Sequence, residues 1–268
     1  MAFSTYYMQS IFFGLLLFFI CFDAYGVTVV PFSNMPADNG TLTAPSNETV
    51  INYKIDFWLI RNAAHGVLRF ASHPKWLRVS FEAETQGILR TLAGSRRELM
   101  ESIMEYNADT RRFRPLSFRE EFSHGSTTYV KIINFDYVLD QYTYHFIRNG
   151  VKTFSATHRL PNHQVDDLLS FLCNLQNKAY GPVYEGCVLR ACVIMKEKPS
   201  YVTVTFSAPS KKPPLPSCCH YVILSMERDI TNARSGRIRG WLSPALIPVA
   251  GIVEDAYFFG DLTITSIE

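Results

Sequence analysis

The densest grouping of side chains that could bind a metal or transfer protons lies beyond the middle of the chain. It comprises His158, His163, Asp166 and Asp167. A metal site needs three or four ligands at characteristic spacings, and no matching third or fourth ligand accompanies this group. The two aspartates could also act as acid and base, but they precede an apolar helical pattern, where aspartate commonly caps a helix. We therefore expect no metal, no cofactor and no catalytic residue here.

Sequence motifs of familiar enzyme classes are missing from the chain. It contains no Gly-x-Ser-x-Gly elbow, no His-Glu-x-x-His, no Gly-x-Gly-x-x-Gly and no phosphate loop. A non-enzymatic protein is therefore favoured. A hydrolase whose site is assembled from distant residues, such as His158 and Asp166, stays open as an alternative.

Arginines cluster in three places, at 96–97, 111–114 and 234–239. The 26 basic residues are nearly balanced by 24 acidic ones, so the net charge of +2 produces no strong field for a polyanion. We expect no nucleic-acid partner. An anionic envelope polymer or a lipid head group is the sharper alternative for these arginines.

Aromatic side chains are abundant, with 20 Phe and 14 Tyr. Such residues suit β-strands and fill cores, which is the simplest explanation. A sheet folded around an apolar groove could instead shelter an acyl chain or another hydrophobic ligand. The candidates for such a groove, chosen by their strand phase, are Tyr53, Phe57, Tyr137, Tyr144 and Phe146.

Period-two patterns dominate the elements that must position these residues. Apolar and polar side chains alternate over 51–59, which predicts a strand with one buried face. The pattern continues over 76–90 and 127–139. Two further runs, 142–148 and 151–158, flank Asn149-Gly150, the preferred pair for a tight hairpin turn. About ten strands are expected in all.

One segment of the chain clearly has the spacing of a helix and interrupts the predicted strands. Leucines and a phenylalanine follow Asp166 and Asp167 with helical periodicity, so we expect one clear helix at about 166–177. A second short helix is expected at 96–105. The predicted fold class is mainly β, a curved antiparallel sheet or a partly open β-barrel.

The amino terminus has the pattern of an export signal. Residues 1–22 carry no charge and are rich in Phe, Leu and Ile, and Ala24-Tyr25-Gly26 places small residues where signal peptidase cleaves. We expect cleavage between Gly26 and Val27; if it does not occur, the segment is a membrane anchor. The predicted organisation is a signal peptide at 1–26, a flexible leader at 27–49 and a single β-rich domain at 50–268.

Five cysteines remain after the expected cleavage, so at least one lacks an intramolecular partner. Cys187 and Cys192 lie on one predicted strand at a spacing that points them to opposite faces, which excludes a bond between them. A cross-strand pair with Cys218 or Cys219 is open in an oxidising compartment, and buried free thiols are the simpler reading.

Three stretches of the chain resemble an exported bacterial family, the domain-of-unknown-function family numbered 3108. The first is 81–88, with Thr85 and Gly87 in a Thr-x-Gly strand end. The second is 166–175, which is similar to an Asp-x-Leu-Ser helix through Asp167 and Ser170. The third is 240–249, with Trp241 and Pro248.

The resemblance implies an exported, mainly antiparallel β protein of the Gram-negative envelope, similar in shape to the lipoprotein-carrier type of open barrel. It supplies no catalytic residues. Together with the aromatic pattern, it leads us to expect a periplasmic, non-enzymatic carrier for a lipid-like or other envelope component. A structural or assembly partner of a cell-envelope complex is the main alternative, and the oligomeric state stays open.

Overall fold

The computed structural model describes residues 47–93, 95–162, 164–208, 219–227, 236–256 and 260–267. The expected signal peptide, its cleavage site at Gly26 and Val27, and the leader up to residue 46 lie outside the described residues. So do His163 and Cys218.

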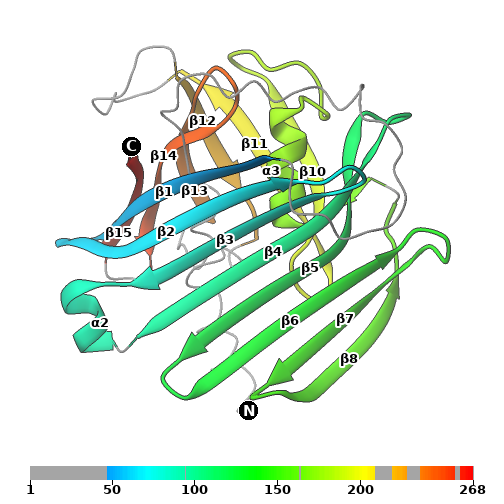
Figure 1. Cartoon of the computed structure of the whole chain (residues 1–268). Coiled ribbons are helices and arrows are strands. Elements are labelled where there is room, and N and C mark those ends of the chain that lie inside the picture. The colour runs from blue at the N-terminus through cyan, green and yellow to red at the C-terminus, as the bar shows by residue number, and fades with distance from the viewer. Residues whose placement is uncertain are drawn as a thin grey trace.

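Within the described residues, the strands form one sheet of 15 strands (Figure 1). The strands of the first half are β1 (Asn47–Phe57), β2 (Ile60–Ser72), β3 (Leu77–Thr85), β4 (Arg96–Asn107), β5 (Arg112–His124), β6 (Thr127–Asp136), β7 (Gln141–Arg148) and β8 (Val151–Arg159). Those of the second half are β9 (Val165–Asp166), β10 (Val188–Ile194), β11 (Pro199–Ser207), β12 (His220–Ser225), β13 (Arg237–Leu242), β14 (Pro248–Ala256) and β15 (Gly260–Ile267).

Two antiparallel meanders, β1–β8 and β10–β15, join side by side through the pairing of β1 with β15. The short strand β9 adds to β10 in parallel. The order therefore runs from β8 through β1 and β15 to β9, and the sheet stays open with β8 and β9 at its ends. This confirms the expected curved, mainly antiparallel sheet.

Helix α3 (Leu168–Gln176) lies inside the curve of the sheet (Figure 1). The sheet has two arms, β1–β8 and β9–β15. The helix packs against β3, β4 and β5 of the first arm and against β9 and β10 of the second. One apolar core cluster includes residues of both arms and of the helix, among them Phe81, Phe171 and Phe206. A hydrogen bond of 2.8 Å from Tyr142 Oη on β7 to the carbonyl oxygen of Glu197 adds a polar link between the arms. The helix therefore contributes side chains to one core that both arms of the sheet share.

Local sequence signals explain the best-predicted elements. Asn149 and Gly150 have φ angles of 49° and 78°, so both adopt the left-handed conformation that a tight hairpin turn between β7 and β8 requires. The predicted helix at 166–177 is α3, with Asp167 as its N-cap.

Two segments differ from the predictions. The expected helix at 96–105 is wrong, because these residues belong to β4, where Glu98, Met100 and Ser102 face inward and their neighbours face outward. The strand expected over 76–90 ends at Thr85, and a short helix, α2 (Gly87–Ala93), follows it. Gly87 has a φ of 54°, which lets the chain turn out of the strand.

The motif residues behind the family resemblance have structural roles. Thr85 is buried and its hydroxyl accepts a hydrogen bond from the backbone N–H of Arg96 at 3.0 Å. Trp241 packs with Tyr221 in a small second core cluster, and Pro248 begins β14. Within the described part of the chain, Cys173, Cys187 and Cys192 are buried free thiols.

Candidate functional site

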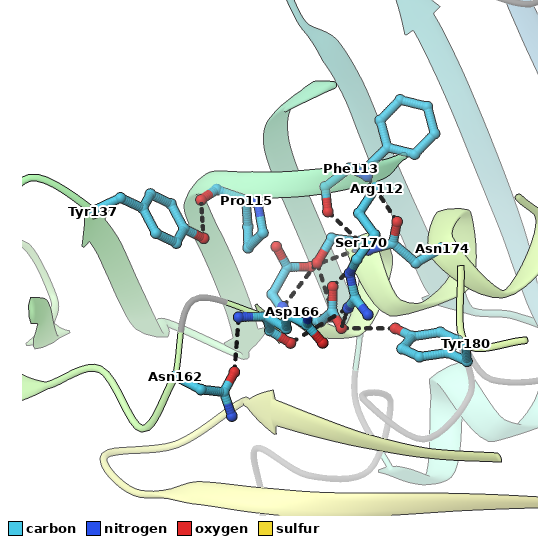
Figure 2. Close-up of polar contacts among 11 residues, drawn as sticks. Arg112, Phe113, Pro115, Tyr137, Asn162, Asp166, Ser170, Asn174 and Tyr180 are labelled. Atoms are coloured by element: carbon cyan, nitrogen blue, oxygen red, sulfur yellow. Dashed lines mark hydrogen bonds and ion pairs between the residues drawn. The ribbon is translucent and has the colours of Figure 1, made fainter. Parts of the chain in front are cut away.

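Asp166 is the centre of a buried polar cluster at the start of α3 (Figure 2). Its Oδ2 accepts hydrogen bonds from Arg112 Nη2 at 2.6 Å and from Tyr180 Oη at 2.7 Å. Its Oδ1 accepts one from Asn174 Nδ2 at 2.6 Å. Burial raises the pKa of Asp166 to about 6, although the Arg112 guanidinium and the hydrogen bonds oppose the increase. The buried polar cluster consists of Ser102, Arg112, Asp166, Asp167, Ser170, Asn174 and Tyr180.

Asp167 caps the helix from the same cluster. Its Oδ1 accepts hydrogen bonds from the backbone N–H groups of Leu169 at 2.7 Å and Ser170 at 2.9 Å. The Ser170 hydroxyl in turn accepts one from the Asp167 N–H at 2.8 Å, which completes a capping box. Ser102 on β4 donates to Oδ2 at 2.6 Å. Burial raises the pKa of Asp167 to about 6, so the cap is an uncommonly desolvated one.

Asn174 joins the middle of α3 to the backbone of β5. Its Oδ1 accepts a hydrogen bond from the N–H of Phe113 at 2.7 Å, and its Nδ2 donates to the Phe113 carbonyl at 2.8 Å (Figure 2). The side-chain amide therefore imitates a neighbouring strand at this point of β5. Since Asn174 is fully buried, these bonds fix both the position and the rotation of the helix.

The buried polar cluster can anchor the helix, but its burial leaves little scope for catalysis. Asp166, Asp167 and Ser170 have no exposed surface, and each carboxylate is occupied by protein donors. The capping interpretation of Asp167 is confirmed. Arg112 from the run 111–114 is turned inward to Asp166, and Arg114 pairs with Glu105. Both arginines thus serve ion pairs within the protein.

The five aromatic residues expected to line a groove lie in three places. Tyr53 and Phe57 are on β1, Tyr137 follows β6, and Tyr144 and Phe146 are on β7. Five strands separate β1 from β7 in the sheet, so the first two are remote in strand order from the last two. Tyr53 and Tyr144 are completely buried, and the Tyr137 hydroxyl donates to the Pro115 carbonyl at 2.9 Å (Figure 2).

A row of aromatic rings crosses the inner face of the sheet near its β8 end. The rings of Phe122 and Tyr129 stack at 6.3 Å between centroids, and those of Tyr129 and Phe146 stack at 6.1 Å. Phe146 is paired with Phe154 across the β7–β8 ladder. Exposure increases along the row from 1% at Phe122 to 41% at Phe154. We call Phe122, Tyr129, Phe146 and Phe154 the edge aromatic row.

Charged groups accompany the edge aromatic row. The Lys131 ammonium lies 2.9 Å from both carboxylate oxygens of Glu120, and both side chains are only 7% exposed. Lys131 pairs with Phe146 in the ladder, so this buried ion pair directly adjoins the aromatic rings. At the rim, the guanidinium of Arg148 lies 5.7 Å from the centroid of the Tyr129 ring. The row thus combines apolar surface with fixed charge.

Sequence reasoning found only Phe146 of the edge aromatic row. Phe122 was missed because β5 was not recognised as a strand, and Tyr129 and Phe154 were missed because their strands were read without their pairing. The available signal was the Asn149-Gly150 turn, which fixes the register that places Phe154 opposite Phe146. In the buried polar cluster, Asn174 could have been found as a polar residue on the apolar face of the predicted helix.

Catalytic pairs are incomplete in the described part of the chain. Ser155 Oγ and His145 Nδ1 are 2.9 Å apart, but no carboxylate among the described residues hydrogen-bonds to His145. Burial and nearby Lys152 lower the pKa of His145. The ring of His158 stacks on the ring of Tyr142, and its Nε2 lies 3.6 Å from a Glu197 carboxylate oxygen. Asp166 has different partners, which belong to the buried polar cluster. These pairs give no specific support to the hydrolase alternative.

Across the described ranges, no group of three or more His, Cys, Asp or Glu side chains is arranged to hold a metal ion. None of the helices within those ranges is long and apolar enough to span a membrane.

The fold and the two sites define a strand-rich protein whose open sheet curls around one anchored helix. No family model, no curated protein and no solved structure matches the chain. The resemblance to the exported family thus stays a prediction, based on the three sequence stretches alone.

Proposed function

We propose that the protein is an exported, non-enzymatic carrier that holds a lipid-like ligand against the edge aromatic row. The observation that carries this proposal is the graded exposure of the row. Its rings are buried at Phe122 and partly open to solvent at Phe154, on the strand that ends the sheet. Apolar rings on the inner face of an open sheet edge provide a surface that an acyl chain would cover.

The charges near the row favour a ligand with a polar head. An acyl chain lying along the more exposed end of the row, Phe146 and Phe154, would bring an anionic head toward Arg148 at the rim. The Glu120–Lys131 pair is already neutralised internally, so it would tolerate a neutral chain beside it without an unpaired buried charge. Export is supported by the amino-terminal sequence pattern, and a periplasmic location by the family resemblance.

A fatty-acid binding assay tests the proposal. We expect the full chain to bind a fluorescent long-chain fatty acid that unlabelled fatty acid displaces. Phe154→Ala and Phe146→Ala should each weaken binding by about tenfold, because each removes an aromatic contact worth on the order of 1.5 kcal/mol. Tyr201→Ala is the matched control, because Tyr201 is half exposed on a different strand, β11. Binding that is absent, or that all three variants reduce equally, would refute the carrier role.

A further inference from the structure

A hollow of about 340 Å³ lies on the outer face of the sheet, at the end where β2 and β3 are joined. Its volume is at the lower end of the range for small-molecule sites. The side chains around it are Glu48, Arg69, His73, Trp76, Arg78 and Glu101, and Ala71 and Ser80 form its floor. It faces away from the core and is separate from the edge aromatic row.

Strand register explains why the outer face is hollowed at this point. Ala71 is paired with Glu48 on one side and Arg78 on the other. In the adjacent row, Ser80 is paired with Arg69 and Glu101. Two short side chains are therefore surrounded by four long charged ones.

An aromatic stack closes one end of the hollow. The rings of His73 and Trp76 are 3.4 Å apart between centroids, and the backbone N–H of His73 donates to the Trp76 carbonyl at 2.9 Å. The Arg78 guanidinium lies 5.4 Å from the Trp76 ring. Burial and the charge of Arg78 lower the pKa of His73, so this wall is neutral at neutral pH. The His73 and Trp76 rings therefore bound the hollow at this end without contributing a charge to it.

The charges around the hollow are only half paired. Arg78 forms an ion pair with Glu101 at 3.6 Å. Within the described part of the chain, Arg69 and Glu48 form no ion pair, and the Ser80 hydroxyl has no hydrogen-bond partner. The hollow thus offers one cation, one hydroxyl and one anion that remain to be satisfied.

We propose that this hollow binds a small zwitterion, a phosphate group joined by a short linker to an ammonium group. Arg69 and Ser80, which are paired across the ladder, donate to the phosphate oxygens, and Glu48 accepts from the ammonium. A simple anion would leave Glu48 without a partner and close to like charge. An apolar ligand would desolvate both charges without compensation.

Calorimetric titration of the full chain tests the site with phosphoethanolamine, inorganic phosphate and ethanolamine as separate probes. We expect phosphoethanolamine to bind most tightly. Arg69→Gln should weaken its binding by about tenfold, the size of one charge-assisted contact. Glu48→Gln should weaken phosphoethanolamine binding similarly and leave the binding of inorganic phosphate unchanged. Arg61→Gln is the matched control on the same strand, because Arg61 is 79% exposed and is not part of the hollow.

Vesicles distinguish the two sources of this chemistry. Binding to phosphatidylethanolamine vesicles, lost in Arg69→Gln, would identify a lipid head group; binding of soluble phosphoethanolamine alone would identify a free metabolite. Either result supports the site. Equal affinity for phosphoethanolamine and inorganic phosphate, no phosphoethanolamine binding, or undiminished binding in Arg69→Gln and Glu48→Gln would overturn it.

Discussion

Burial in the protein interior disfavours the charged form of the Asp166 side chain. Its carboxylate is completely buried, and three side chains of the buried polar cluster donate to it. Burial nevertheless outweighs these donors and raises its pKa from 3.8 to about 6. The folded protein therefore holds this proton more tightly than the unfolded chain does. The stability that results is present at low pH and is lost as the pH rises through about 6.

Asp166→Asn should remove this contribution to the pH dependence of folding. Between about pH 4.5 and pH 7.5, the free energy of unfolding of the wild type should fall relative to that of the variant by about 2 kcal/mol. Urea denaturation at the two pH values measures the difference, with the exposed Asp109→Asn as control. If the two proteins keep the same gap in stability at both pH values, the raised pKa is wrong.

The side chain of Asn174 attaches α3 to β5 through two hydrogen bonds to the backbone of Phe113. Asn174→Leu would leave the N–H and carbonyl groups of Phe113 without their side-chain partner in a buried setting. We expect a loss of about 3 kcal/mol in the free energy of unfolding, since each unsatisfied buried group costs about 1–3 kcal/mol. Asn177→Ala, one turn later at the exposed helix end, should cost less than about 1 kcal/mol. Equal losses in the two variants would contradict the anchoring role.

At the scale of elements, close packing between neighbouring strands sets local constraints. Gly66 on β2 lies against the ring of Phe81 on β3, and a Cβ atom there would come within 2.9 Å of two ring carbons. The glycine therefore makes room for a large aromatic side chain in the core.

Gly66→Ala should destabilise the protein by about 1–3 kcal/mol, the usual cost of overpacking. Phe81→Leu should relieve the clash, so the double variant should be more stable than the sum of the two single effects predicts. Thermal or urea unfolding of the three variants measures this coupling. Simple additivity would mean that the ring and the glycine do not constrain each other.

Elements with local signals were predictable, and those defined by distant pairing were not. Asn149-Gly150 and Asp167 specify a turn and a helix start through their own backbone preferences, and both predictions are confirmed. In β4, Leu99, Met100, Ile103 and Met104 also fit a helical face, so the sequence is ambiguous there. The pairing of β4 with β3 and β5 decides the outcome, and no local pattern reports that pairing.

At the scale of the whole molecule, the open sheet is stabilised through α3. The helix contacts strands of both arms, and its buried polar cluster joins β4, β5 and β9 to it. Sequence reasoning predicted the fold class, whereas the joining of two meanders through β1 and β15 depends on contacts between the two ends of the β domain. For the same reason, the edge aromatic row emerges only when β5 to β8 are aligned.

Photo-crosslinking with a diazirine-bearing long-chain fatty acid tests the central claim, that this row holds a lipid-like ligand, most directly. We expect peptide mass spectrometry of the labelled full chain to find adducts on inner-face residues of β5 to β8, and excess unlabelled fatty acid to remove them. Adducts confined to outer-face residues, or adducts that the competitor leaves unchanged, would contradict the account.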